Sequence, residues 1–419
     1  MRTSSPTAGS VRLSRKSLGP IRARFSLTEV SMRAFPRLLL ISALLACAGS
    51  LLAQQVCRGF TVVMNSPEDK LTMAINGAND PAQQIQALDA YMQAHPNSNF
   101  LPCVDEYYAM AYLKQNNYAK VIEYGEKALA AHDQNELLLL NLTKAYVGSA
   151  QATPEAFQVI MLEPGELRAE TPNARPTGVT DAEWQKTLSD YQTEAKEITA
   201  YMEYAFFFLL PRVADANQRL QYLDQFTKAY ADSSQQGRVD FQYFIAYKML
   251  NNSAKADAYG EKAVTEDPNN VDALNLLAYD YGIGRTNPAK AAEYARKVLE
   301  LAPQIKKPPE MTDAQYQTAL NSKLGLAHLT LGYVDFLESP RTHRIAPAID
   351  QFKTAASLLN GNPDYQAQAL FYLGNAYEFA YPPNHRAAAE ALERAASLQT
   401  PWQGRARELL AKVRAAERR

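Results

Sequence analysis

Apolar residues recur along most of this chain with the three- and four-residue spacing of amphipathic helices, and the helical stretches come in pairs. One pair contains Tyr112, Val121 and Tyr124 at apolar positions, and the pattern repeats about 34 residues later. Asn and Pro residues separate the stretches; Pro268 and Asn270, for example, stop one helix and cap the next. The pattern predicts consecutive helices rather than strands, because strands require a two-residue alternation.

The helical pattern is also duplicated over a longer distance. Residues 81–146 align without a gap with residues 216–281, at a constant offset of 135 and with 24 identities in 66 columns. The segment YGEKA stands at 124–128 and again at 259–263. A third, shorter occurrence is FYLGNAY at 371–377. A fixed period of this kind indicates a fold built from repeated units.

These segments resemble the tetratricopeptide repeat (TPR) family. Tyr and other large residues occupy the first helix of each pair, and Ala occupies positions in the second helix where neighbouring helices approach to 8–10 Å. The strongest matches are 102–146, 237–303 and 367–400. The resemblance implies an all-α fold, an α–α superhelical solenoid of stacked antiparallel helix pairs. In such a fold the first helix of each pair lines a concave groove.

A segment without repeat character interrupts the two copies. Residues 148–196 contain a Pro- and Gly-rich part, followed by a helix expected from about Asp181 with Trp184 and Tyr191 on one face. We therefore expect TPR-like repeats on both sides of a helical insertion, and a basic capping helix at the end. The expected segments are a first copy (64–147), the insertion (148–196), a second copy (197–303), C-terminal repeats (304–400) and the capping helix (401–419).

The N-terminal region predicts export. Residues 32–53 place basic residues before an apolar run, as in a secretory signal peptide, and the run is too short to span a membrane. Residues 1–31 are then a non-native or untranslated extension, with an organelle transit peptide as the alternative. Leu44 to Cys47 resembles a bacterial lipobox, so lipidation at Cys47 and cleavage near Ala53 both remain open. We expect a periplasmic or cell-envelope protein.

Two cysteines remain after such a leader. An exported chain with Cys57 and Cys103 is allowed a disulfide by compartment and by even number. The alternative is a buried, unbridged Cys103 and a free Cys57.

Composition and charge exclude other classes. Of 43 Lys and Arg and 44 Asp and Glu residues, eight basic and one acidic lie within residues 1–55, so the rest has a formal net charge of −8. An acidic body of this kind gives no electrostatic attraction for nucleic acid. With 47% hydrophobic residues it has enough apolar material for a large core.

The sequence contains no recognisable catalytic or metal motif. None of its five histidines stands at metal-ligand spacing, and HExxH, GxxxxGK[ST] and GxSxG are all absent. We therefore expect no enzyme activity, no cofactor and no metal site.

The family resemblance instead places candidate binding residues in the groove. The residues at its groove-facing positions, called the groove set below, are Met110, Leu140, Lys144, Phe241, Ile245, Met249, Asn275, Tyr279, Phe371 and Asn375. Glu106, Lys114, Arg238 and Phe379 fall on the same face. Many of these residues are apolar or aromatic, as expected where a peptide or a partner helix docks. The alternative is that the insertion helix fills the groove and makes them core. Glu106 and Met110 stand where a carboxylate clamp needs Lys and Asn, which argues against a receptor for acidic C-terminal tails.

Three functions remain open. The first is a non-catalytic scaffold or adaptor of the bacterial cell envelope that binds a protein or peptide in the groove. The second is an envelope assembly factor, similar to outer-membrane lipoproteins that help protein or polymer export. In the third, the insertion 148–196 forms a solute-binding or enzymatic site. Contact with a membrane is expected only through a lipid anchor.

Overall fold

The computed structural model describes residues 57, 60–131, 135–309 and 311–418, and all regular elements in these ranges are helical. Seventeen α-helices, α2 to α18, confirm the all-α prediction for this part of the chain. Two compact units divide at Asp267 and Pro268. The division falls inside the predicted second copy (197–303), in the connection between the helices that end at Glu266 and begin at Val271.

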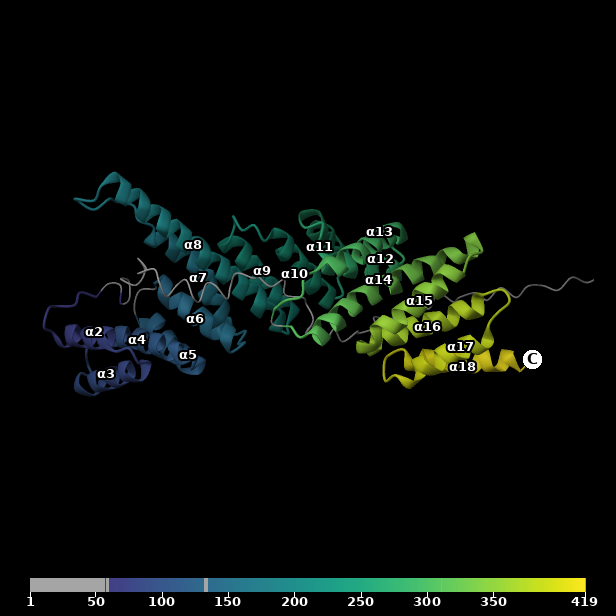
Figure 1. The fold of residues 1–419 in the computed structure, drawn as a ribbon, viewed down its shortest axis with the longest axis horizontal. Coiled ribbons are helices and arrows are strands. Elements are labelled where there is room, and N and C mark those ends of the chain that lie inside the picture. The colour runs from purple at the N-terminus through teal and green to yellow at the C-terminus, as the bar shows by residue number, and fades with distance from the viewer. Residues whose placement is uncertain (1–56, 58–59, 132–134, 310, 419) are drawn as a thin grey trace, which may run out of the picture. The chain divides into compact units, whose positions relative to one another are not determined.

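The first unit consists of helices that pack on their neighbours in the sequence (Figure 1). Short connections make successive helices antiparallel, as in the predicted pairs. The helices are α2 (Pro67–Gly77), α3 (Pro81–Ala94), α4 (Leu101–Lys114), α5 (Tyr118–Ala131), α6 (Glu136–Gly148), α7 (Pro154–Glu170), α8 (Asp181–Leu209), α9 (Ala216–Ala229), α10 (Gln236–Met249) and α11 (Ser253–Glu266).

The sequence duplication is reproduced in the backbone. The bounds of α3, α4 and α5 recur, each shifted by 135 residues, in α9, α10 and α11. The turns between the paired helices are also the same. Asn116 and Asn251 both have φ of 55°, a left-handed conformation that Asn tolerates better than most residues. The next residue in each copy, Asn117 or Asn252, caps the following helix through its side-chain oxygen.

Close helix contact explains the glycine of the YGEKA segment. A Cβ added at Gly125 of α5 would lie 2.6 Å from Leu142 Cδ2 of α6, so a larger residue would force the leucine to move. Ala128, one turn later, is completely buried. Small residues on α5 therefore let α6 pack closely, as the sequence pattern predicts.

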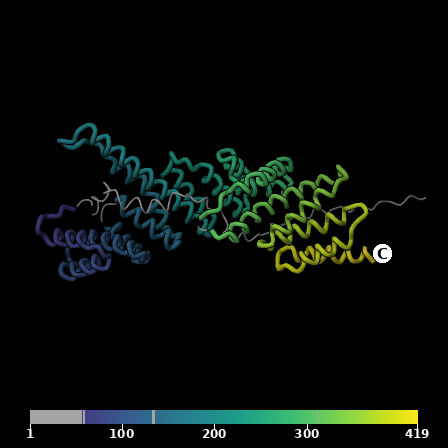
Figure 2. Tube along the Cα trace, viewed as in Figure 1, coloured from purple at the N-terminus to yellow at the C-terminus, as the bar shows by residue number. Residues whose placement is uncertain are grey.

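The insertion is a pair of helices, α7 and α8, joined to the core of the first unit. As predicted, α8 begins at Asp181, where Thr180 and Glu183 form a capping box. It continues past residue 196, and its second half is buried: the Phe206 ring stacks on Phe226 of α9 at 4.2 Å and meets Phe157 of α7 edge-on at 5.8 Å. The first turns of α8 are largely exposed and extend away from the other helices (Figure 2).

The second unit continues the helix pairs in the same way. Its helices pack on their neighbours in the sequence, and one apolar core is formed by residues 326–413. Helix α18 packs on α17, where a capping helix is expected. The helices are α12 (Val271–Gly284), α13 (Pro288–Leu301), α14 (Asp313–Thr342), α15 (Ala346–Leu358), α16 (Pro363–Phe379), α17 (His385–Ser397) and α18 (Gln403–Glu417).

A disulfide joins Cys57 to Cys103 at the start of α4. The Cys57 amide also donates to Glu106 Oε2 at 3.2 Å, and Asn135 Nδ2 donates to Glu106 Oε1 at 3.0 Å. Cys57 is therefore attached to α4 both covalently and by a buried carboxyl.

We expect Cys57→Ser to lower the free energy of unfolding by about 2–4 kcal/mol, because the bridge closes a loop of 46 residues in the unfolded chain. Urea unfolding with and without dithiothreitol measures this loss. The reductant should destabilise the wild type and leave the variant unchanged; equal stability of the wild type in both buffers would contradict the prediction.

The predicted leader (32–53), the preceding residues 1–31 and Cys47 lie outside the described residues. Among the helices of the described ranges, none combines the length and the apolar character needed to cross a membrane.

Candidate partner-binding site

In the first unit, helix α8 covers part of the predicted groove face. Helix α8 packs on α6, and Leu140 of the groove set lies in the same apolar cluster as Ile198 and Met202 of α8. Lys144, one turn after Leu140, is half-buried, and the loss of hydration lowers the pKa of its ammonium group. Met110 on α4 is also half-buried. The residues of α8 that share this cluster with Leu140 lie beyond the predicted insertion (148–196), in the second half of the same helix.

Glu106, expected on the groove face, is instead a structural residue. Its side chain is completely buried and holds Cys57 and Asn135, as described above. Burial is the main cause that raises the pKa of Glu106 to about 7. The helical register could not show this, because the residues that cover Glu106 lie 49 and 29 positions away in the sequence.

The groove-set residues of α10 are also inaccessible. Phe241 and Ile245 are only 5% and 7% exposed, while Met249 near the end of the helix is half-buried. A ligand could reach the first two side chains only if the chain rearranged.

In the second unit, the groove set connects helices to one another. Asn275 Nδ2 of α12 donates to the Lys323 carbonyl of α14 at 2.9 Å. Tyr279 donates its hydroxyl to Gln368 Oε1 of α16 at 2.8 Å. Asn375 Nδ2 donates to the Phe371 carbonyl of its own helix at 3.1 Å. Each of the two asparagine amides thus donates one N–H within the chain.

Two aromatic residues at and just after the end of α16, Phe379 and Tyr381, remain exposed. Phe379, the last residue of α16, is 58% exposed, and its ring lies edge-on to Phe336 of α14 at 5.3 Å. Tyr381, two residues further along, is fully exposed. We call Phe336, Phe379 and Tyr381 the aromatic edge. The sequence register had placed only Phe379 on this face; the sole sequence signal for Tyr381 is an aromatic residue in the Tyr-Pro-Pro connection between two helices.

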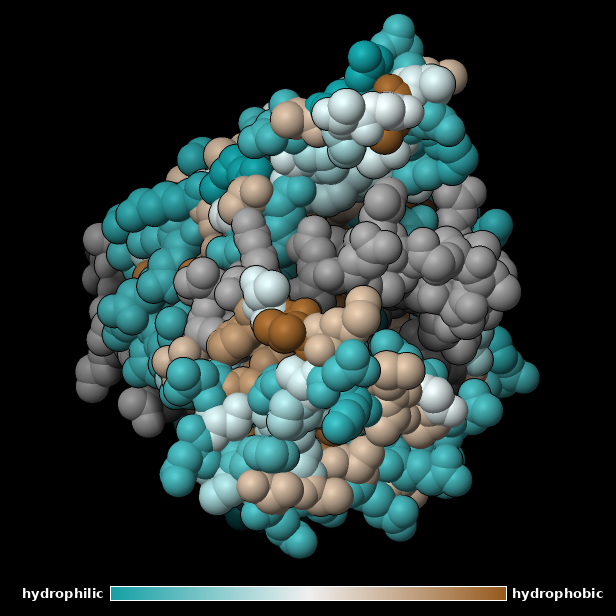
Figure 3. Space-filling model, turned by 90° about the vertical axis from the view of Figure 1, so that its left-hand side faces the viewer, coloured by the Kyte–Doolittle hydropathy of each residue, from teal (hydrophilic) through white to brown (hydrophobic). Residues whose placement is uncertain are grey.

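A second exposed apolar group lies at the start of the first unit. Seen from the end that carries α2 and α3, a mainly hydrophilic surface contains a hydrophobic group of residues (Figure 3). The exposed large apolar side chains of the segment before α2 and of α2 itself are Val62, Val63, Met64 and Met73. No sequence pattern had singled them out.

Buried carboxyl groups form the most unusual electrostatic feature of the first unit. Glu136, the first residue of α6, is completely buried, and neither of its carboxyl oxygens has a hydrogen-bond partner among the described residues. Burial, followed by the charges of Glu163 and Glu170, raises its pKa to about 9. Glu163 of α7 accepts from Thr199 Oγ1 at 3.0 Å, and burial raises its pKa to about 7. In the described part of the chain, no His, Cys, Asp and Glu residues are grouped so that three could hold a metal ion.

Comparison with known proteins gives structural neighbours alone. No family model and no curated protein sequence matches the chain. Similar solved structures include yeast Tom70, with a TM-score of 0.29, 13% identity, and coverage of 84% of this chain and 96% of that chain. The Cut9–Hcn1 hetero-tetramer of APC/C has a TM-score of 0.27 and 14% identity, with coverage of 84% of this chain and 91% of that chain. The TPR domain of P58(IPK) has a TM-score of 0.26 and 12% identity, with coverage of 83% of this chain and 97% of that chain.

Superpositions with TM-scores this low support no argument about function. The fold is instead established by the chain itself. Helices α4, α5, α10 and α11 have 14 residues each, and the bounds of the first pair recur in the second at an offset of 135 residues, with equivalent turns. These are stacked antiparallel helix pairs.

Proposed function

We propose that this chain is a non-catalytic scaffold that binds a peptide or a helix of a protein partner. The observation that supports this function most is the aromatic edge. Phe379 occupies a groove-facing register position and remains exposed, whereas the other large aromatic residues of that face are buried or half-buried. Exposed aromatic side chains supported from beneath by a second ring are typical anchors of protein interfaces.

The site of action that we propose is the bacterial cell envelope. This part of the proposal rests on the leader-like sequence at 32–53. Processing at Cys47 would favour the envelope assembly factor, because lipidation tethers a protein to a membrane. Mass spectrometry of the mature N-terminus distinguishes a lipidated Cys47 from an unmodified start near Gln54.

We expect the double variant Phe379→Ala/Tyr381→Ala to reduce partner capture about tenfold or more, because aromatic anchors contribute most of an interface's binding energy. The measurement is native cross-linking and co-purification from the envelope fraction, quantified against the wild type. Thermal stability should change little, since both side chains are exposed.

Phe371→Ala is the matched control for this experiment. The Phe371 ring packs 5.3 Å from Trp402 and is half-buried, so its removal should lower the melting temperature. If the double variant captures its partner as well as the wild type does, the aromatic edge is not the binding surface.

A further inference from the structure

The two sequence copies contain equivalent stacks of three tyrosines. In each stack, two rings come from the first helix of the pair and one from the second helix. Ring centroids are 4.5 and 5.7 Å apart in the first copy and 4.6 and 5.4 Å apart in the second. The innermost hydroxyl donates to an aspartate of the preceding helix in both, at 2.5 and 2.6 Å. The stacks are Tyr108, Tyr112 and Tyr124 with Asp89, and Tyr243, Tyr247 and Tyr259 with Asp224.

Two lysines lie over each stack. In the first copy, Lys120 Nζ and Lys127 Nζ are 5.5 and 4.7 Å from the centroid of Tyr124. In the second copy, Lys255 Nζ is 4.9 Å from the Tyr247 centroid, and Lys262 Nζ is 4.6 Å from the Tyr259 centroid. Each ammonium group is thus attracted to the face of an aromatic ring. The two lysines of a pair are seven residues apart, so they share one face of the helix.

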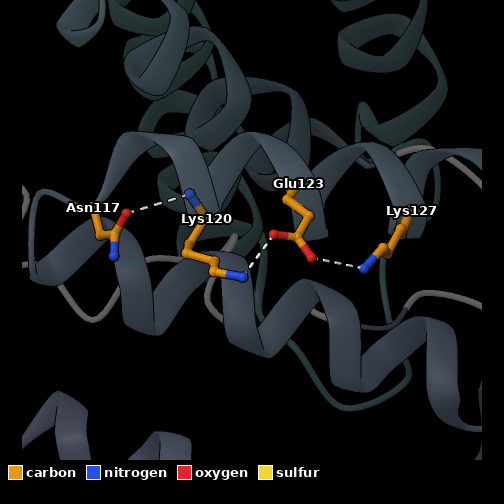
Figure 4. A network of polar contacts seen from close by, with 4 residues as sticks. All are labelled: Asn117, Lys120, Glu123 and Lys127. Atoms are coloured by element: carbon orange, nitrogen blue, oxygen red, sulfur yellow. Dashed lines mark hydrogen bonds and ion pairs between the residues drawn. The ribbon is translucent and has the colours of Figure 1, made fainter.

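The copies differ in the residue between the lysines. In the first copy, Glu123 bridges the pair: Oε2 accepts from Lys120 Nζ at 2.7 Å and Oε1 from Lys127 Nζ at 3.0 Å (Figure 4). The equivalent residue of the second copy, 135 positions later, is Ala258. Among the described residues no carboxylate forms an ion pair with Lys255 or Lys262. Lys255 Nζ lies 3.5 Å from the Tyr247 hydroxyl.

Nearby acidic residues do not replace the missing carboxylate. Burial raises the pKa of Asp240 of α10, and the charge of Lys262 opposes this rise without forming an ion pair. Asp105 has the same relation to Lys127 in the first copy, where Glu123 is present as well. Glu266 follows Lys262 by one turn and also makes no ion pair with it. The second copy therefore retains the tyrosines and lysines of a carboxylate-binding site but lacks its carboxylate.

We propose that Lys255 and Lys262 bind a carboxylate from an acidic segment of a protein partner, in the position that Glu123 fills in the first copy. One carboxylate can bridge two lysines with this spacing, as the first copy shows. The tyrosine stack limits the freedom of the ammonium groups, which lowers the entropy lost on binding. This surface lies on α10 and α11, so the inference does not depend on the aromatic edge.

The test is isothermal titration calorimetry of the full chain with an acetylated, amidated hexaglutamate peptide at low ionic strength. Low salt is needed because exposed ion pairs are screened. We expect binding with one site per chain and no binding of the matched hexaglutamine peptide. Lys255→Gln/Lys262→Gln should weaken binding about tenfold or more, and Ala258→Glu should do the same by supplying an internal carboxylate.

The first copy provides both a matched control and a gain of function. Lys120→Gln/Lys127→Gln should leave the affinity unchanged, because Glu123 already occupies that pair. Glu123→Ala should instead create a second site and raise the stoichiometry from one to two. The proposal is overturned if the wild type does not bind hexaglutamate, if hexaglutamine binds equally well, or if the Lys255/Lys262 variant keeps the wild-type affinity.

Discussion

The free energy of unfolding should fall steeply as the pH rises from about 6 to about 9. Glu136 and Glu163 have folded-state pKa values of about 9 and about 7, whereas an unfolded glutamate titrates near 4.3. Between these values the folded chain holds protons that the unfolded chain releases. Each such proton lowers the free energy of unfolding by about 1.4 kcal/mol per pH unit, so Glu136 alone gives a loss of about 3–4 kcal/mol over this range.

The direction of the effect follows from protonation of the folded state. The stabilisation is complete below the unfolded pKa and is lost as the pH rises through about 7 for Glu163 and about 9 for Glu136. Urea unfolding followed by far-ultraviolet circular dichroism at pH 6, 7, 8 and 9 measures it. The charges that oppose ionisation of Glu136 all come from α7 and α8, namely Glu163, Glu166, Glu170 and Glu194.

Glu136→Gln is the matched control, because it keeps the shape of the side chain and removes the titration. This variant should be more stable than the wild type at pH 9, and its stability should depend less on pH. An unchanged slope in the variant would show that Glu136 is not the group responsible.

Phe206→Ala should lower the free energy of unfolding by about 3–5 kcal/mol, the usual range for a buried aromatic residue. The ring is fully buried and contacts Phe226, Phe157 and Phe207. Its loss leaves a cavity between α7, α8 and α9, where the insertion joins the repeated helices. Chemical denaturation with fitted m-values checks that the change is one of stability alone.

Phe208, two residues further in the same AFFFLL run, is the matched control. Its ring is half-buried and lies beneath Arg212, at 3.8 Å from the guanidinium carbon. Phe208→Ala should therefore cost clearly less than Phe206→Ala. If the two variants were equally unstable, the cavity at the helix junction would not explain the loss.

The sequence predicted the paired helices well, because the determinants of a pair are local. The spacing of apolar residues, the Asn turns and Gly125 all act within one or two neighbouring helices. The start of α8 was also predictable, since Asp181 directly follows Thr180, the N-cap residue of a complete capping box. Such short-range signals can be recognised in the sequence without knowledge of the tertiary contacts.

The candidate site was much harder to predict. A register argument identifies the face on which a residue lies, but not what covers that face. Leu140 is covered by α8, which the sequence separates from it by more than forty residues. Asn275 and Tyr279 form hydrogen bonds to residues 48 and 89 positions away. Phe379, at the end of its helix, packs on Phe336 along one edge and remains 58% exposed.

The equal helix bounds of the two copies have a consequence for how this chain can change over time. In stacked helix pairs, stability is close to a sum of terms within each pair and between neighbours. The second copy has Ala258 at the position equivalent to Glu123, and its tyrosine stack and Asn turn are nevertheless intact. In a duplicated scaffold of this kind, a surface residue of one copy can change without loss of the fold, while the other copy keeps a different residue at the equivalent position.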